Sequence, residues 1–234
     1  MATTTTNFGW DIPQSTDLVK DGATAIAALG QDIDTAFVDF KGGTTGQVLK
    51  KTSGTDLDVE WGTASSGMTL ISTTTFSAVS SVSLANNTFT STYEDYRVIL
   101  KLTATSTDNN VVYLKLRASG TDSSASYYWN RFGTYTGNGT PGGTVAANNS
   151  AGIWLQSTYS TGFFPTIGKI DLFAPQLATK TAMLVNTSHN SGGGEVASFS
   201  GGGFHNAATA YDAASFSITA GTISGSIIVY GMAK

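Results

Sequence analysis

Hydrophobic and polar residues alternate with a period of two over most of the chain after Thr69. The clearest stretches are residues 96–102 and 111–117, which a polar turn at 105–110 separates, and they predict an antiparallel hairpin with one buried face. About ten such strands, with no helical pattern between them, indicate an antiparallel β-sandwich of the jelly-roll type over residues 68–234. The other predicted strands are 81–85, 127–133, 152–157, 168–173, 182–187, 195–200, 215–219 and 225–230.

Residues 15–41 follow a different period, with alternating spacings of three and four. This heptad pattern predicts a coiled-coil-like helix that begins after N-cap residues at 15–17. Gly22 and Gly30 each cost about 1 kcal/mol relative to Ala, so the helix needs a partner. That partner is either the chain's own β-domain or other copies of the helix. The heptad seam consists of Val19, Gly22, Ile26, Leu29, Ile33, Ala36 and Phe40.

Short segments flank this helix on both sides. Residues 1–14 predict an extended tip in which Phe8, Trp10 and Ile12 alternate with polar residues before Pro13. The tip either staples the start of the helix or docks into a larger assembly. After the helix, residues 42–67 predict a connector with strands at 47–50 and 57–61, and one such hairpin is not stable alone.

The composition favours a folded chain with little ionic chemistry. Of the 234 residues, 40% are hydrophobic and 12% are charged, so the chain can bury a core. The absence of cysteine excludes disulfides, a thiol nucleophile and a Cys-ligated metal. The first 15 residues predict no secretory signal, and no apolar run reaches the roughly 18 residues of a membrane span.

Charge is concentrated in the first part of the chain. Residues 1–66 carry nine acids and four bases, a net charge of −5, whereas residues 67–234 carry seven acids and eight bases, a net charge of +1. A nearly neutral domain without a basic stripe argues against nucleic acid as a partner.

Carboxylates in the β-domain give no catalytic pattern. Glu94 and Asp95 are strand neighbours that point to opposite faces, so they form no two-carboxylate site. Asp171 and Glu195 could still face one another in the fold as the two carboxylates of a glycosidase. Asp108 begins a hairpin turn rather than a calcium loop. The sequence therefore predicts no enzyme.

Histidines and glycine runs give no metal or phosphate pattern either. His189 and His205 are interpreted as turn histidines, too few to hold a metal. The glycine runs at 192–194 and 201–203 lack a following Lys-Ser/Thr and helix, so they are interpreted as flexible loops around a strand. We expect no metal and no cofactor.

Aromatic residues gather in the middle of the β-domain. Alternation directs about half of them outward or into a subunit interface. They form either core and interface, or a receptor patch, because Trp and Tyr offer stacking area with a polar handle that suits sugars. Residues 136–150 predict an exposed apical loop. The receptor candidates are Tyr128, Trp129, Trp154 and Tyr159.

Three segments resemble a known class of proteins. NFGWDIP at 7–13, followed by DLVKDGATAI at 17–26 and LGQDID at 29–34, resembles the N-terminal segment of many bacteriophage tail-fibre and minor virion proteins. GTTGQVL at 43–49 with DVEW at 58–61 resembles a connector module of phage fibres. GSIIVYG at 225–231 is similar to the last strand of many phage fibre heads.

The resemblance implies a homotrimer on the virion, attached by its N-terminus, with the C-terminal head exposed for host adsorption. A single connector copy implies a short fibre. The attachment residues would be Phe8, Trp10, Ile12 and Pro13, and the trimerisation residues would be Val19, Ile26, Leu29, Ile33 and Phe40.

The expected function is that of a structural fibre or short-spike protein of a phage virion. Its partners would be itself, other tail or capsid proteins, and a host-surface glycan or protein, without nucleic acid or membrane insertion. One alternative is a purely structural capsid or collar fibre, or decoration protein, without a specific receptor. Another is a polysaccharide depolymerase.

Overall fold

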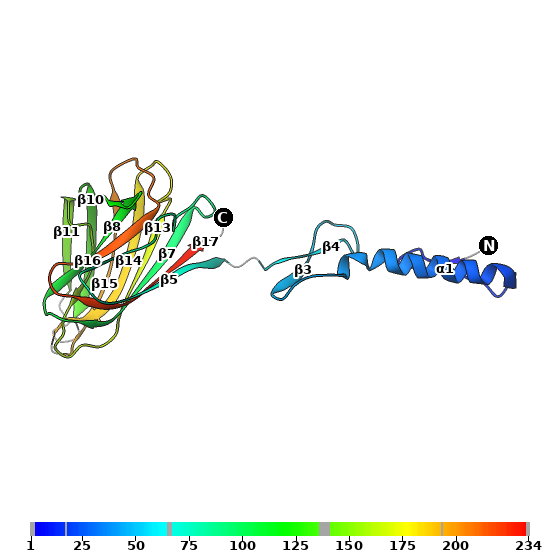
Figure 1. Cartoon of the computed structure of the whole chain (residues 1–234), viewed down its shortest axis with the longest axis horizontal. Coiled ribbons are helices and arrows are strands. Elements are labelled where there is room, and N and C mark those ends of the chain that lie inside the picture. The colour runs from blue at the N-terminus through cyan, green and yellow to red at the C-terminus, as the bar shows by residue number, and fades with distance from the viewer. Residues whose placement is uncertain (1–2, 17, 65–66, 136–140, 193, 233–234) are drawn as a thin grey trace. The chain divides into compact units, whose positions relative to one another are not determined.

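The protein is mainly β, with one α-helix near its N-terminus (Figure 1). The computed structural model describes residues 3–16, 18–64, 67–135, 141–192 and 194–232. Strands make up 53% and helix 10%, and the sheets are antiparallel, so the predicted fold class is confirmed at that level. The chain divides into an N-terminal unit, Met1–Ser65, and a C-terminal unit, Ser66–Lys234, which are described separately.

The N-terminal unit contains a helix between two small hairpins. Helix α1 is shorter than predicted at both ends. It begins after Leu18, whose side chain has no atom that could cap the helix. Of the predicted N-cap residues, Ser15 and Thr16 lie in a turn before the helix, and Asp17 lies outside the described residues. The helix ends where Phe37 leaves the helical conformation. The elements are β1 (Thr3–Thr4), β2 (Asp11–Ile12), α1 (Val19–Ala36), the 3-10 helix η1 (Val38–Phe40), β3 (Gln47–Lys51) and β4 (Val59–Thr63).

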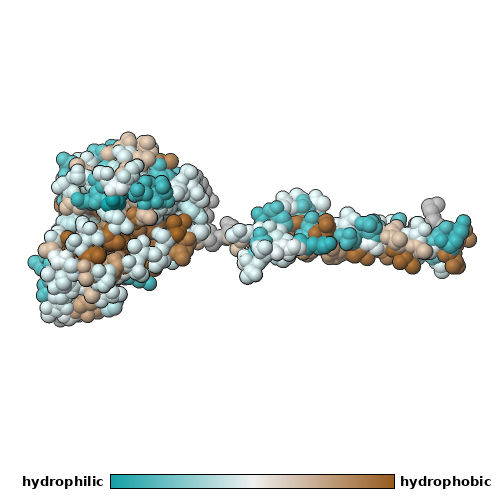
Figure 2. All heavy atoms as spheres, viewed as in Figure 1, coloured by the Kyte–Doolittle hydropathy of each residue, from teal (hydrophilic) through white to brown (hydrophobic). Residues whose placement is uncertain are grey.

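Helix α1 has no buried residue. Val19, Ile26 and Ile33 of the heptad seam are 96%, 67% and 40% exposed, and Figure 2 shows hydrophobic atoms along one side of the helix. Leu29 is partly covered, and the helix contacts β2 of its own unit. The described part of the unit therefore covers one side of the heptad seam and leaves Val19, Ile26 and Ile33 exposed.

The predicted connector hairpin is confirmed, with β4 beginning two residues later than expected. Leu49 pairs with Trp61 across the two strands. The Trp61 indole donates a hydrogen bond of 3.3 Å to the Phe40 carbonyl at the end of η1. Its ring lies over Gly43, where φ is +83° and a Cβ would be 2.7 Å from a ring carbon. Only glycine fits this position without strain.

Strands of the C-terminal unit form two sheets. The larger sheet has the order β11-β10-β15-β14-β13-β7-β17-β5, and the smaller has the order β12-β8-β16-β6, with β9 beside β8. The strands are β5 (Met68–Val79), β6 (Ser81–Ser83), β7 (Asp95–Thr105), β8 (Asn110–Ala118), β9 (Thr121–Asp122), β10 (Tyr127–Tyr135), β11 (Gly142–Asn149), β12 (Ile153–Thr158), β13 (Thr166–Phe173), β14 (Thr181–Asn190), β15 (Val196–His205), β16 (Ala213–Ile218) and β17 (Ile223–Met232).

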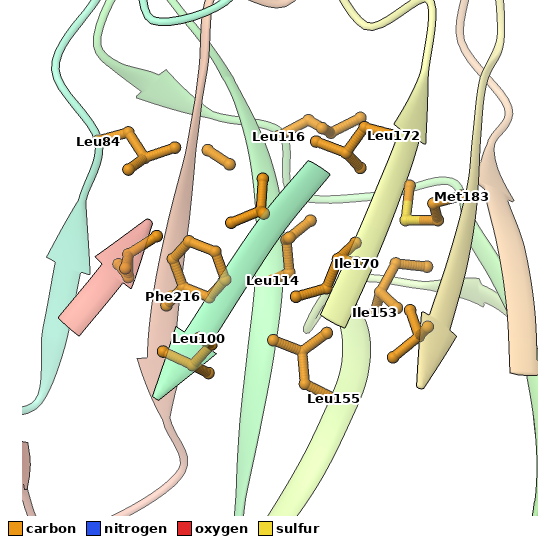
Figure 3. Close-up of a cluster of buried hydrophobic side chains, with 14 of the residues drawn as sticks. Leu84, Leu100, Leu114, Leu116, Ile153, Leu155, Ile170, Leu172, Met183 and Phe216 are labelled. Atoms are coloured by element: carbon orange, nitrogen blue, oxygen red, sulfur yellow. The ribbon is translucent and has the colours of Figure 1, made fainter. Parts of the chain in front are cut away.

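Both sheets supply residues to one hydrophobic cluster (Figure 3). Leu114 and Phe216 of the smaller sheet lie among Leu100 and Ile170 of the larger sheet, and all four are fully buried. Each such side chain contributes about 1.5–3 kcal/mol by leaving water. The alternation predicted for residues 96–102 and 111–117 is confirmed, because their even-numbered residues are the buried ones.

The predicted pairing of these two stretches is wrong. Strand β7 pairs with β13 and β17, whereas β8 pairs with β12 and β16, so the turn between them crosses from one sheet to the other. Both strands direct their even-numbered residues into the same core. Their alternation therefore shows which face is buried but does not identify the neighbouring strand.

Two further strands lie at the edges of the larger sheet. Strand β11 spans Gly142–Asn149, so this part of the predicted apical loop is wrong, and residues 136–140 lie outside the described residues. Strand β5 was also not predicted over its length. Strand β5 is rich in Ser and Thr, and β11 is rich in Gly and Asn. An edge strand has a neighbour on one side, and its backbone ladder holds it there.

Residues 201–203 form part of strand β15 and are not the predicted flexible loop. A Cβ on Gly201 would collide with the Asn130 carbonyl, and one on Gly203 with the Tyr128 carbonyl. These glycines allow close approach of β15 to β10, which is a recognised reason for glycine inside a strand.

Candidate functional site

Exposed apolar side chains cluster on four neighbouring strands of the larger sheet. Phe132 on β10 and Val145 on β11 are 61% and 80% exposed, and Leu184 on β14 and Phe204 on β15 are also exposed. Residues Val145, Asn130, Gly202 and Leu184 are successive partners in the strand register, so they share one face. Such a patch on a surface marks a binding site or an interface more often than a chance arrangement.

A groove crosses this face, and we call it the outer groove. Its aromatic wall is formed by Tyr128 and Phe204, whose rings stack 5.0 Å apart at an interplanar angle of 4°. Val145 lies on β11 opposite, Gly202 supplies a floor without a side chain, and Asn130 provides an exposed amide. A flat aromatic wall with an amide beside it suits a ligand that offers both an apolar face and hydroxyl groups.

The four receptor candidates do not lie together. Tyr128 is on the outer groove, but Trp129 is the next residue on β10 and points to the opposite, inner face. There it packs edge-to-face against Trp154, with centroids 5.6 Å apart at 90°. Tyr159 is separate again, since its hydroxyl donates to Asn109 Oδ1 at 3.2 Å. Alternation along β10 explains this split between faces, which the prediction of Tyr128 and Trp129 as joint candidates did not take into account.

The inner face holds a buried cation that the sequence did not identify. Arg131 is 8% exposed, and its guanidinium carbon lies 3.5 Å from the Trp154 ring centroid and 4.2 Å from that of Phe199. Its Nε donates to Thr144 Oγ1 at 3.1 Å. Among the described residues no carboxylate pairs with it. Burial lowers the pKa of Arg131 to about 10, so it stays charged at neutral pH and is stabilised by the two rings.

His189 lies beside this cation and is not a turn histidine. It belongs to strand β14, is buried, and its ring stacks on Phe199 at 5.8 Å. Burial, and then the charge of Arg131, lower the pKa of His189 to about 4. The imidazole is therefore neutral at physiological pH.

His205 is also buried in a strand, so the second turn assignment is wrong as well. Its Nε2 lies 2.7 Å from Ser123 Oγ and 2.8 Å from the Ala125 carbonyl, and its Nδ1 lies 3.1 Å from the Tyr211 hydroxyl. Burial lowers the pKa of His205. Both ring nitrogens have partners inside the protein, which is the environment of a structural histidine.

Asp171 and Glu195, the pair that the sequence left open for glycoside hydrolysis, lie apart. Asp171 accepts two hydrogen bonds from Arg97, at 2.6 and 2.9 Å, and Arg97 has a raised pKa because of this contact. Asp171 pairs in register with Leu184, whereas Glu195 precedes Val196, the partner of Asn190. Six residues of strand separate them by about 20 Å, too far for a pair of glycosidase carboxylates.

Asp108 links two loops through hydrogen bonds and does not belong to a calcium-binding set of ligands. Its carboxylate accepts hydrogen bonds from the Thr161 backbone N–H at 3.0 Å and hydroxyl at 2.9 Å, and from the Ser160 hydroxyl at 2.8 Å. These bonds lower the pKa of Asp108 to about 2. No group of three or more metal-ligating side chains occurs within the described ranges.

The predicted attachment residues form an exposed tip in the N-terminal unit. Phe8 and Trp10 stack with centroids 4.9 Å apart at 18°. The turn that carries them is closed by Thr5, whose N–H donates to the Trp10 carbonyl at 2.8 Å and whose hydroxyl accepts from the Trp10 N–H at 3.0 Å. Phe8 and Ile12 are exposed, and Trp10 and Pro13 are partly covered. The tip is thus held in one conformation with part of its apolar surface exposed.

No protein family model, curated protein or solved structure matches the chain. None of the helical residues described forms a segment long and apolar enough to cross a membrane.

Proposed function

We propose that the protein is a structural fibre or short-spike protein of a bacteriophage virion. Its N-terminal tip would attach it to a tail or capsid protein, α1 would assemble three copies, and the C-terminal unit would adsorb to the host surface. The observation that carries this proposal is the exposure of Val19, Ile26 and Ile33 on a helix with no buried residue. A helix of 18 residues with two glycines is stable in water when other helices cover its seam.

The choice of three copies and of a virion rests on the resemblance of residues 7–34 and 43–61 to phage fibre proteins. The stacked and exposed tip supports attachment, because an ordered apolar surface favours docking over a free tail. Light scattering on the full-length protein tests the assembly directly. The expected mass is three times the 24.2 kDa chain, and a single-chain mass would refute this part of the proposal.

We further propose that the C-terminal unit is a jelly-roll β-sandwich with two inserted hairpins. Along the chain, strands β5 to β8 alternate between the two sheets, β12 joins β8 in the smaller sheet, and β13, β16 and β17 alternate again. The spatial orders are β5-β17-β7-β13 and β6-β16-β8-β12. Eight strands in two such sheets define a jelly roll. The inserted pairs β10–β11 and β14–β15 widen the larger sheet, and the outer groove lies on these added strands.

We propose the outer groove as the receptor site, with a neutral sugar as its ligand. Tyr128 and Phe204 would stack on the sugar ring, and Asn130 would bind a hydroxyl. Trp129 and Trp154 would support the strand from behind, and Tyr159 would lie outside the site. No catalytic step and no cofactor form part of the proposal.

Binding of the labelled full-length protein to host cells tests the receptor site. Tyr128→Ala and Phe204→Ala should each weaken binding at least tenfold, because both remove stacking area. Ile167→Ala is the matched control, since Ile167 is exposed on the same sheet but on β13, outside the groove, and it should leave binding unchanged.

Two results would contradict the proposal that the protein binds a host receptor without catalysis. Lack of binding by the wild-type protein across host strains would favour a purely structural fibre. Release of reducing ends from host polysaccharide would favour a depolymerase.

A further inference from the structure

A small cavity lies on the inner face, behind the outer groove. Trp129, Arg131, Trp154 and Thr187 are among its lining residues, and Trp129 and Gly202 line both the cavity and the groove. The volume open to the centre of a water-sized sphere is about 10 Å³. This space is about the least that a single water-sized group needs.

Four side chains that line the cavity carry a buried polar atom without a hydrogen-bond partner. These atoms are Trp129 Nε1, Arg131 Nη1, Trp154 Nε1 and Thr187 Oγ1. Indole and guanidinium nitrogens can only donate, and the threonine hydroxyl can do so as well. Buried polar atoms normally have partners, so four unpaired atoms around one cavity indicate a place for an acceptor.

The positive charge beside the cavity favours an anion as the acceptor. Arg131 is nine-tenths buried, and none of the lining side chains is a carboxylate. All four unpaired atoms can donate a hydrogen bond, and an anion that accepts from them would also neutralise the guanidinium, which a water molecule would not do. The lowered pKa of Arg131 agrees with a cation that lacks a counter-ion.

We propose that this cavity binds a small monovalent anion, either a halide ion or a carboxylate group, through Arg131, Trp129, Trp154 and Thr187. The inference does not depend on the proposed phage function. The carboxylate could come from a free small acid or from an acidic sugar, and both present the same chemistry to the donors.

The test is a titration of the full-length protein, in halide-free buffer, with chloride, bromide, formate or glucuronate. The melting temperature of the wild-type protein should rise with anion concentration, and calorimetry should give a saturable heat. Bromide should appear in the cavity by anomalous scattering. Binding of formate without glucuronate would identify a free anion, and competition by glucuronate would identify a sugar carboxylate.

Arg131→Met should weaken binding at least tenfold and abolish the rise in melting temperature. In anion-free buffer the same variant should melt at the wild-type temperature or above it, because the substitution removes an uncompensated buried charge. Thr187→Val keeps the side-chain shape and should weaken binding several-fold. Thr134→Val, on the exposed face of β10, should leave it unchanged. An equal response of the wild type and Arg131→Met, or no response of the wild type to any anion, would overturn the proposal.

Discussion

The C-terminal unit buries its apolar residues within one chain, whereas the N-terminal unit leaves most of its apolar residues exposed. The C-terminal core combines both sheets and includes fully buried residues such as Leu114 and Phe216. Helix α1 has no buried residue, although its heptad seam carries Val19, Ile26, Leu29 and Ile33. Stability of the C-terminal unit should therefore be a property of the single chain, and stability of the N-terminal unit should depend on protein concentration.

The largest loss of stability is expected when a substitution creates a new cavity in the C-terminal core. Phe216→Ala removes a fully buried ring between the two sheets and should lower the free energy of unfolding by about 3–5 kcal/mol. Phe8→Ala is the matched change in the N-terminal unit. It removes an exposed ring and should alter the free energy of unfolding by less than about 0.5 kcal/mol. Urea denaturation measures both, and similar values would contradict the contrast between the units.

Acid should weaken the C-terminal unit through His189. Its pKa is lowered from 6.5 to about 4 in the folded state, so the unfolded chain takes up the proton first as the pH falls. Stability is then full above about pH 6.5, decreases between pH 6.5 and 4, and has lost up to about 3 kcal/mol below that range. His189→Gln should flatten this part of the profile. An unchanged slope in the variant would show that His189 is not responsible.

A charged residue introduced into the heptad seam should prevent assembly of the chains without changing the stability of the C-terminal unit. Ile26→Asp removes the burial of one isoleucine per chain at the proposed interface, about 2 kcal/mol, and adds a charge there. The expected result is a single-chain mass by light scattering with an unchanged melting temperature of the C-terminal unit. Gln31→Asp, on an exposed position outside the seam, is the control and should keep the assembly intact.

Prediction from sequence was successful where burial is one-sided and local. The even-numbered residues of β7 and β8 are buried as their alternation predicted, and the connector hairpin lies where its strands were expected. The edge strands β5 and β11 were not listed among the predicted strands, because their polar residues gave no sharp limits for a strand. The pairing of β7 with β8 was wrong, because periodicity indicates a face and not a neighbour.

The Arg131 cavity could not be predicted for a further reason. It joins residues 131, 154, 187 and 199, which come from strands β10, β12, β14 and β15 of both sheets. In the sequence, Arg131 occupies a position that alternation assigns to the inner face of β10. An arginine at such a position is the single local signal, because burial of a charged residue without a partner is rare.

The smallest effects on the free energy of unfolding are expected from two ion pairs, one in each unit. In the C-terminal unit, Arg97 binds Asp171 through two nitrogens, and the carboxylate is mostly buried. In the N-terminal unit, Lys50 and Glu60 form a single contact of 2.9 Å with both side chains 53% exposed. Charge-assisted bidentate bonds are the stronger kind, and exposed pairs contribute about 0–1 kcal/mol.

Asp171→Asn should therefore lower the free energy of unfolding by about 1 kcal/mol, and Glu60→Gln by less than about 0.5 kcal/mol. Added salt should reduce the second effect more than the first, because solvent screens exposed charges efficiently. Urea denaturation of both variants at low and high salt measures the difference. If Glu60→Gln were the more damaging change, the N-terminal unit would depend on its own polar contacts more than its exposed seam implies.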